Sequence, residues 1–99
     1  MVTIEINDPI IATLQDNILN VHNSQVIFRQ LEETVREHRK DLVLNLEHVR
    51  SCDSSTIASF VELQTLVKSF GKELSIINIS PFVMKIFDML HIKKLFNVV

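Results

Sequence analysis

The spacing of apolar residues changes several times along the chain, and each spacing predicts one kind of element. In residues 2–6 apolar and polar side chains alternate, which is typical of a half-buried strand. Residues 7–9, Asn-Asp-Pro, predict a turn, because Asn and Asp side chains bond their own backbone and Pro presets φ. Residues 10–14 then predict a second strand, paired with the first as a hairpin and followed by a loop around residues 17–23.

Three later segments repeat apolar residues at helical spacing. The first begins at Ser24, whose hydroxyl suits a helix cap, and runs to His38. The second follows the polar residues 51–55 and stops at Gly71, and the third has Ser80 as its cap and Pro81 as its first residue. The side chains expected to face the core are Ile27, Phe28, Leu31, Val35, Ile57, Phe60, Val61, Leu63, Val67, Phe70, Val83, Ile86, Phe87 and Leu90.

Short apolar runs lie before, between and after these helices. Residues 42–46 and 74–79 predict strands that are buried on both faces, and residues 95–99 predict a last strand. The element order is therefore ββαβαβαβ. Strands that alternate with helices are joined by right-handed crossovers. We therefore expect a single α/β domain over residues 1–99, with a mixed, mostly parallel sheet covered by helices.

Composition and charge exclude several classes of function but add little to the prediction of the fold. The 99 residues are 46% hydrophobic, enough for one core, and their net charge of -2 lacks the basic field that general nucleic-acid binding requires. No apolar run approaches the ~18 residues of a membrane span. The single glycine excludes nucleotide binding through GxGxxG or GxxxxGK loops, which need several glycines. One cysteine, Cys52, and the lack of a basic leader segment favour a reducing, cytoplasmic location.

Candidate chemistry is expected where strands pass into helices, because ligands of open α/β sheets bind at that edge. Three such junctions lie at residues 20–24, 51–56 and 79–82, and the middle one carries the most hydroxyl groups. A phosphate on Ser54 or Ser55 would lie near the positive end of the following helix, where an anion gains roughly 0.3–1 kcal/mol. The alternative is that this cluster serves only as a helix cap.

Several short motifs at this spacing resemble one family. They are Leu-Val-Leu-Asn-Leu at residues 42–46, Asp-Ser-Ser at 53–55, Ser-Pro-Phe-Val at 80–83 and Phe-Asp-Met at 87–89. Residues 19–24 also lie where that family has a stretch like ELDHHTA. Together these motifs resemble the STAS domain, and more closely the bacterial anti-sigma-factor antagonists of the sporulation and stress-response type. The resemblance covers nearly the whole chain and implies a regulator that is not an enzyme and needs no cofactor.

The resemblance implies a partner switch controlled by phosphorylation. In that family the second serine of a DSSG motif is phosphorylated by a serine kinase that doubles as the anti-sigma factor, and a serine phosphatase reverses the reaction. The unphosphorylated antagonist binds the kinase and frees the sigma factor, whereas the phosphoprotein does not bind. Carried over to this sequence, Ser55 is the phosphoacceptor. The residues expected to contact the partner are Asn20, His22, Asp53, Ser54, Ser55, Thr56, Phe82, Met84 and Met89.

This sequence departs from the family pattern in three places. Thr56 replaces the glycine that follows the second serine, so Thr56 and Ser54 stay open as alternative acceptors. Asn20 replaces an acidic residue in the neighbouring loop, and this substitution puts the contribution of that loop to kinase contact in doubt. The sequence ends at Val99, before the C-terminal helix that is common in the family.

The residues alone leave two other kinds of protein open. One is a STAS docking subunit, never phosphorylated, of a larger assembly such as a lipid-transport ATPase complex or a stressosome. The other is a small-ligand binder that uses a helix N-terminus as an anion site. In either case Phe82, Met84 and Met89 complete a small core or form an apolar patch that faces a partner.

Catalytic and metal chemistry have weaker support in the sequence. A hydrolase would need His22 beside Ser54 or Ser55, which the sequence does not place. The four histidines lie in different segments without metal-ligand spacing, so no metal site is expected. Cys52 has no neighbouring base in the sequence, and we expect a small buried residue rather than a reactive thiol.

Overall fold

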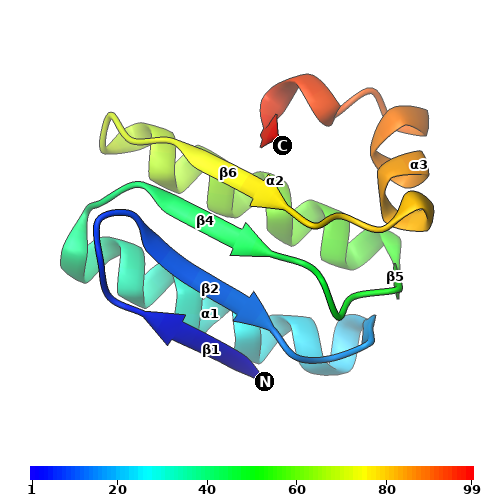
Figure 1. Cartoon of the computed structure of the whole chain (residues 1–99), viewed down its shortest axis with the longest axis horizontal. Helices are drawn as coiled ribbons and strands as arrows, with labels where there is room; N and C mark the ends of the chain where they lie inside the picture. Colours follow the sequence, from blue (N-terminus) through cyan, green and yellow to red (C-terminus); the bar gives the residue numbers. More distant parts are fainter.

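The computed structural model describes residues 1–99 and contains a central mixed sheet of five strands. Its strands are β1 (Val2–Glu5), β2 (Ile10–Leu14), β4 (Leu42–Asn45), β6 (Leu74–Ile77) and β7 (Asn97–Val98), in the order β1-β2-β4-β6-β7 (Figure 1). β1 and β2 form the predicted antiparallel hairpin, and the other neighbours are parallel. The predicted α/β class and mostly parallel sheet are confirmed.

The sheet is covered by helices on one face only. α1 (Val21–His38) and α2 (Ser54–Ser69) pack against each other and lie on the same side of the strands (Figure 1). Side chains therefore alternate between buried and partly exposed positions along β2, β4 and β6. The prediction that residues 42–46 and 74–79 are buried on both faces is wrong, because both crossover helices return over the same face.

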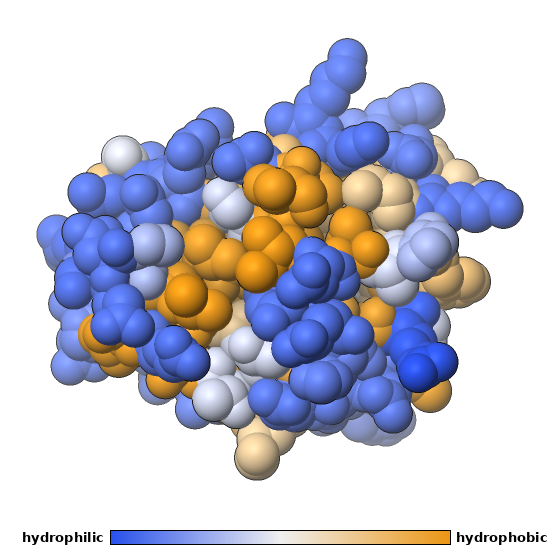
Figure 2. Space-filling model, in the orientation of Figure 1, coloured by the Kyte–Doolittle hydropathy of each residue, from blue (hydrophilic) through white to orange (hydrophobic).

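The uncovered face, here called the open face, is partly apolar. Ile11, Val43 and Ile77 belong to it and are only partly buried, since they point away from the helices. In Figure 2, which has the orientation of Figure 1, apolar side chains run across the middle of this face among polar neighbours.

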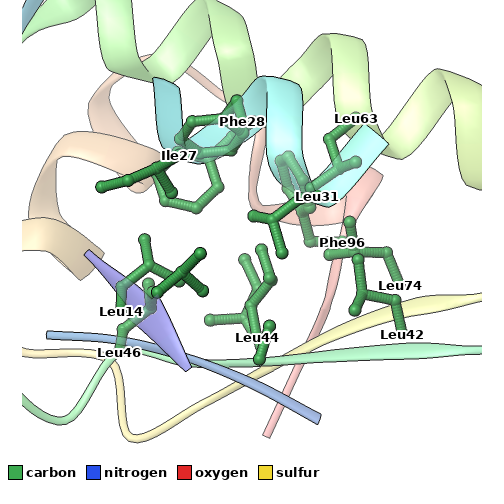
Figure 3. Packing of buried hydrophobic residues seen from close by; sticks show 14 of the residues in the cluster. Leu14, Ile27, Phe28, Leu31, Leu42, Leu44, Leu46, Leu63, Leu74 and Phe96 are labelled. Atoms are coloured by element: carbon green, nitrogen blue, oxygen red, sulfur yellow. The ribbon is translucent and has the colours of Figure 1, made fainter. Parts of the chain in front are cut away.

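The core lies between the sheet and the two long helices. It contains 22 buried hydrophobic residues, part of which Figure 3 shows, with Leu14 and Leu44 from the sheet opposite Leu31 from α1. Phe60 of α2 is fully buried, and its ring makes edge-on contacts with Phe28 at 5.0 Å and Phe87 at 5.7 Å between centroids. Burying one such ring contributes about 1.5–3 kcal/mol, and these contacts tie all three helices together.

The sequence predicted a cap for the first and third helices, and only the second of these two predictions is correct. Ser80 caps α3 (Pro81–Met89) as predicted, and its Oγ accepts from the Val83 N–H at 3.2 Å. The predicted cap Ser24 is wrong, because α1 begins earlier, at Val21 with Asn20 as its cap, and Ser24 is buried within the helix. Leu90, expected in the core, is 49% exposed because α3 ends before it.

The predicted last strand is shorter than residues 95–99. A 3₁₀ turn, η1 (Lys93–Leu95), precedes β7 and contains Leu95, the first residue of the predicted strand. Gly71 ends α2 as predicted, in the left-handed conformation at φ 72 that glycine accepts without strain. None of the helices combines the length and apolarity that crossing a bilayer requires.

Candidate functional site

A second, two-stranded sheet brings the starts of α1 and α2 together. β3 (Ile18–Leu19) pairs in parallel with β5 (Ser51–Cys52), and the Asp53 N–H donates to the Leu19 carbonyl at 3.2 Å. These short strands, which the sequence did not predict, precede α1 and α2 directly. α3 also contacts β5, so the three strand-to-helix junctions converge at one end of the molecule (Figure 1). We call this end the junction face.

The carboxylate of Asp53 is the central polar group of the junction face. As N-cap of α2 it accepts hydrogen bonds at Oδ1 from the Ser55 hydroxyl at 2.7 Å and from the Thr56 N–H and hydroxyl, both at 3.0 Å. The backbone N–H of Val21, at the start of α1, is close enough to make a small contribution to lowering the pKa of this carboxyl. The pKa of Asp53 is lowered, first by the Ser55 hydroxyl and then by the Thr56 N–H, because these donors stabilise the ionised form.

The three candidate hydroxyl groups differ in accessibility. Ser54 and Ser55 are exposed in the first turn of α2, whereas Thr56 is 0% exposed. The Thr56 side chain lies beneath the turn with its hydroxyl bonded to Asp53. The Thr56 side chain is therefore not accessible from solvent, either to a partner protein or to a kinase. Solvent reaches only the other two hydroxyls.

Asn20 is a structural cap rather than a free loop residue. Its Oδ1 accepts from the His22 N–H at 2.8 Å and the Asn23 N–H at 3.3 Å, and the Asn23 side chain accepts from the Asn20 N–H at 2.9 Å. This reciprocal capping box is the Asn-x-x-Asn counterpart of the usual Ser/Thr-x-x-Glu pattern, so the signal was present in the sequence. His22 is exposed beside it and makes no hydrogen bond to Ser54 or Ser55.

Apolar side chains border these polar groups. On α3, Phe82 is 55% and Met89 69% exposed, while Met84 is half-buried. They do not complete the core, which α3 reaches through other residues. Sequence reasoning missed Ile18 and Val21, each 57% exposed, although both lie in the chain segment around Asn20. The junction face thus combines two accessible serines with an apolar border of Ile18, Val21 and Phe82, whereas Met89 lies at the far end of α3.

Cys52 is half-buried in β5 and packs against the edge of the core. Burial raises the pKa of its thiol to about 11, and the adjacent Asp53 carboxylate adds to the shift. A thiol with so high a pKa is a poor nucleophile at neutral pH, because the thiolate is the reactive form. No three His, Cys, Asp or Glu side chains lie close enough together to hold a metal ion.

Comparisons with known proteins agree on one family. The family model of the STAS domain matches residues 1–99. No curated protein matches the sequence. Among solved structures, a putative anti-sigma factor antagonist from Thermotoga maritima has a TM-score of 0.83 at 18% identity, covering 98% of this chain and 84% of that chain.

Two further structures are of the anti-sigma factor antagonist SpoIIAA. The unphosphorylated form has a TM-score of 0.83 at 16% identity, covering 100% of this chain and 88% of that chain. The phosphorylated form, described as a Bacillus cell fate determinant, has a TM-score of 0.76 at 15% identity, covering 100% of this chain and 91% of that chain. At these identities the likeness establishes the fold.

Replacing Asp53 should change how stability depends on pH. Because its folded pKa is lowered, the ionised group stabilises the fold above its unfolded pKa, near 3.9, and this stabilisation is lost as pH falls through the folded pKa. We expect the stability difference between wild type and Asp53→Asn to be largest at neutral pH and to shrink below about pH 4. Urea unfolding between pH 7 and pH 2.5 measures it. Ser55→Ala should lose part of the same pH dependence, and parallel curves for wild type and Asp53→Asn would contradict the assignment.

Cys52 should react slowly with thiol reagents in the folded protein. Raising a thiol pKa from 9.0 to about 11 lowers the thiolate fraction at pH 8 about a hundredfold. We expect a disulfide reagent to modify the folded protein about a hundred times more slowly than the guanidinium-unfolded protein, with Asp53→Asn faster than wild type. Equal rates for folded and unfolded protein would show that Cys52 is neither buried nor affected by Asp53.

Proposed function

Because the chain belongs to the STAS domain family, we propose that it is an anti-sigma-factor antagonist switched by phosphorylation of Ser55. Its unphosphorylated form binds a serine kinase that also acts as the anti-sigma factor, in the cytoplasm, and a serine phosphatase restores this form. The observation that carries the proposal is the exposed Ser55 hydroxyl, held by the ionised Asp53 carboxylate at the start of α2.

Geometry favours Ser55 over its neighbours as the acceptor. Its hydroxyl donates to Asp53 at 2.7 Å, which fixes the direction of the proton and leaves the oxygen lone pairs facing solvent. Ser54 is equally exposed, but its side chain makes no hydrogen bond, so its hydroxyl is not oriented. Thr56 is buried. Ser55 is therefore the accessible hydroxyl that the fold orients.

Charge explains how phosphorylation would prevent docking. A phosphate adds about -1.5 to -2 charge beside the Asp53 carboxylate, and the fold tolerates it because the first turn of α2 is in water. Burying the same group in an interface without a matched cation would cost several kcal/mol. The modification should therefore block binding while the fold stays intact.

The apolar border of the junction face would favour binding of a partner, and a phosphate on Ser55 would oppose it. Val21 begins α1 directly after β3, the strand that pairs with β5 before Asp53, and Phe82 lies in the first turn of α3. Exposed Phe, Ile and Val side chains beside a small polar group are typical of a protein-binding surface with a dry core. A partner that covers them would also cover Ser55.

Phosphate transfer tests the acceptor. Incubation with a candidate serine kinase and ATP should add about 80 Da, one phosphoryl group, to wild type and to Ser54→Ala, and nothing to Ser55→Ala. Intact-mass measurement reads the result. Phosphate on Ser55→Ala would move the acceptor to Ser54. If the kinases encoded near this gene all bind the protein without modifying it, a fixed STAS docking subunit becomes the better assignment.

Binding tests the charge mechanism separately. Ser55→Ala should bind the kinase as wild type does, and Ser55→Asp at least roughly tenfold more weakly, because an unpaired charge would be buried. Calorimetry measures the affinities, and circular dichroism checks that both variants fold. Ser69→Asp, which adds the same charge at the other end of α2, is the matched control and should bind normally. Equal affinities for Ser55→Ala and Ser55→Asp would refute charge exclusion.

A further inference from the structure

The strand β1 forms an edge of the main sheet whose outer side has no partner. β1 pairs with β2 on one side only, and Figure 1 shows no strand or helix beyond it in the plane of the sheet. The Gln15 N–H donates to the Met1 carbonyl, so the odd-numbered residues of this segment direct their backbone groups toward β2. The backbone groups of Val2 and Ile4 therefore point outward, where they are free to pair with another strand.

This edge lacks the features that usually keep edge strands apart. Proline, lysine and β-bulges protect such edges in other proteins. The sequence of β1 is Val-Thr-Ile-Glu, and its unbroken register with β2 contains no bulge. Ile4 is only partly buried, and Ile6, directly after the strand, is 45% exposed. The opposite edge, β7, has only two residues, so β1 offers the longer edge for pairing.

A second copy of the chain fits this edge because β1 is complementary to itself in the antiparallel direction. Outward backbone groups must meet across the pair, so a two-fold axis can pass at Thr3, Ile4 or Glu5. An axis at Glu5 would place two carboxylates opposite each other. An axis at Ile4 would need an extended Ile6, where the chain already turns, because the Asn7 N–H donates to the Glu5 carbonyl. An axis at Thr3 avoids both problems.

We propose that the protein forms a weak dimer in which the β1 strands of two copies pair antiparallel, with Thr3 opposite Thr3 of the second copy. The two five-stranded sheets then form one continuous sheet. Val2 of each copy lies opposite Ile4 of the other, and each of these pairs exchanges two backbone hydrogen bonds. The Thr3 hydroxyl already accepts from Gln15 at 3.2 Å, so its own proton is available to the facing threonine.

The dimer leaves the junction face accessible in both copies. The junction face lies at the carboxyl ends of the parallel strands, beyond β2 and β4. Antiparallel pairing of β1 reverses the strand direction in the second copy, so the two junction faces point in opposite directions. Each copy can therefore bind its own partner. The dimer does not rest on the proposed function, and a change at Ser55 should not affect it.

Sedimentation equilibrium tests the dimer. Between about 20 µM and about 1 mM the average mass should rise from 11.4 kDa toward twice that value, because so short a strand pair predicts a Kd of roughly 0.01–1 mM. Thr3→Lys places two like charges opposite each other and should remain a monomer. Thr65→Lys, at an exposed threonine of α2, is the matched control and should dimerise as wild type does. A wild type that is still a monomer at about 1 mM, or a folded Thr3→Lys that dimerises normally, would overturn the proposal.

Cysteine cross-linking tests the register. In a Cys52→Ala background, diamide should link Thr3→Cys into a disulfide dimer, because facing residues of a non-hydrogen-bonded pair have Cα atoms about 4.5 Å apart. Glu5→Cys is the control, since its two copies would lie roughly 14 Å apart along the strands. Non-reducing gels measure the rates, and circular dichroism checks the fold. Failure of a folded Thr3→Cys to link faster than Glu5→Cys would overturn the register.

Discussion

The need to satisfy the backbone N–H groups at helix starts shapes this molecule more than any other constraint. The first turn of every helix leaves donors without intrahelical partners. Here side chains of Asn20, Asp53 and Ser80 accept from them, the first two directly after a strand and Ser80 shortly after β6. Asp53 does more than the others, because its carboxylate also accepts from the hydroxyls of Ser55 and Thr56. Its backbone N–H donates to the Leu19 carbonyl, which links the start of α2 to the strand before α1.

Packing holds the junction face in place around the exposed serines, where we propose that a charge is added. The pairing of β3 with β5 fixes the two helix starts relative to each other, and the aromatic contacts of Phe60 fix α3 against both. A charge added at an exposed serine then alters the surface without any need to alter the packing beneath it. A regulator that works by excluding a partner needs a fold of this kind. The modified protein must stay folded, so that removal of the charge restores binding.

The two ends of α2 serve different purposes. At its start the polar groups are exposed and mutually bonded, and at its C-terminal half Gln64 is buried with one bond made and one missing. The difference follows from what packs on the helix: solvent at one end, and the segment of η1 and β7 at the other. Only the second arrangement leaves a buried acceptor, Gln64 Oε1, without a partner.

Local sequence patterns were enough to predict the helices, the strands of the main sheet and the hydroxyl cluster at the start of α2, because these depend on contacts within about four residues or on regular alternation. The capping box of Asn20 and Asn23 is also a local pattern, although the sequence analysis placed the cap at Ser24. The packing of the whole chain leaves one sheet face open, buries Thr56 and brings Gln64 against Leu95, 31 residues away. Those outcomes depend on which face the crossovers cover and on contacts between distant segments, which no local pattern records.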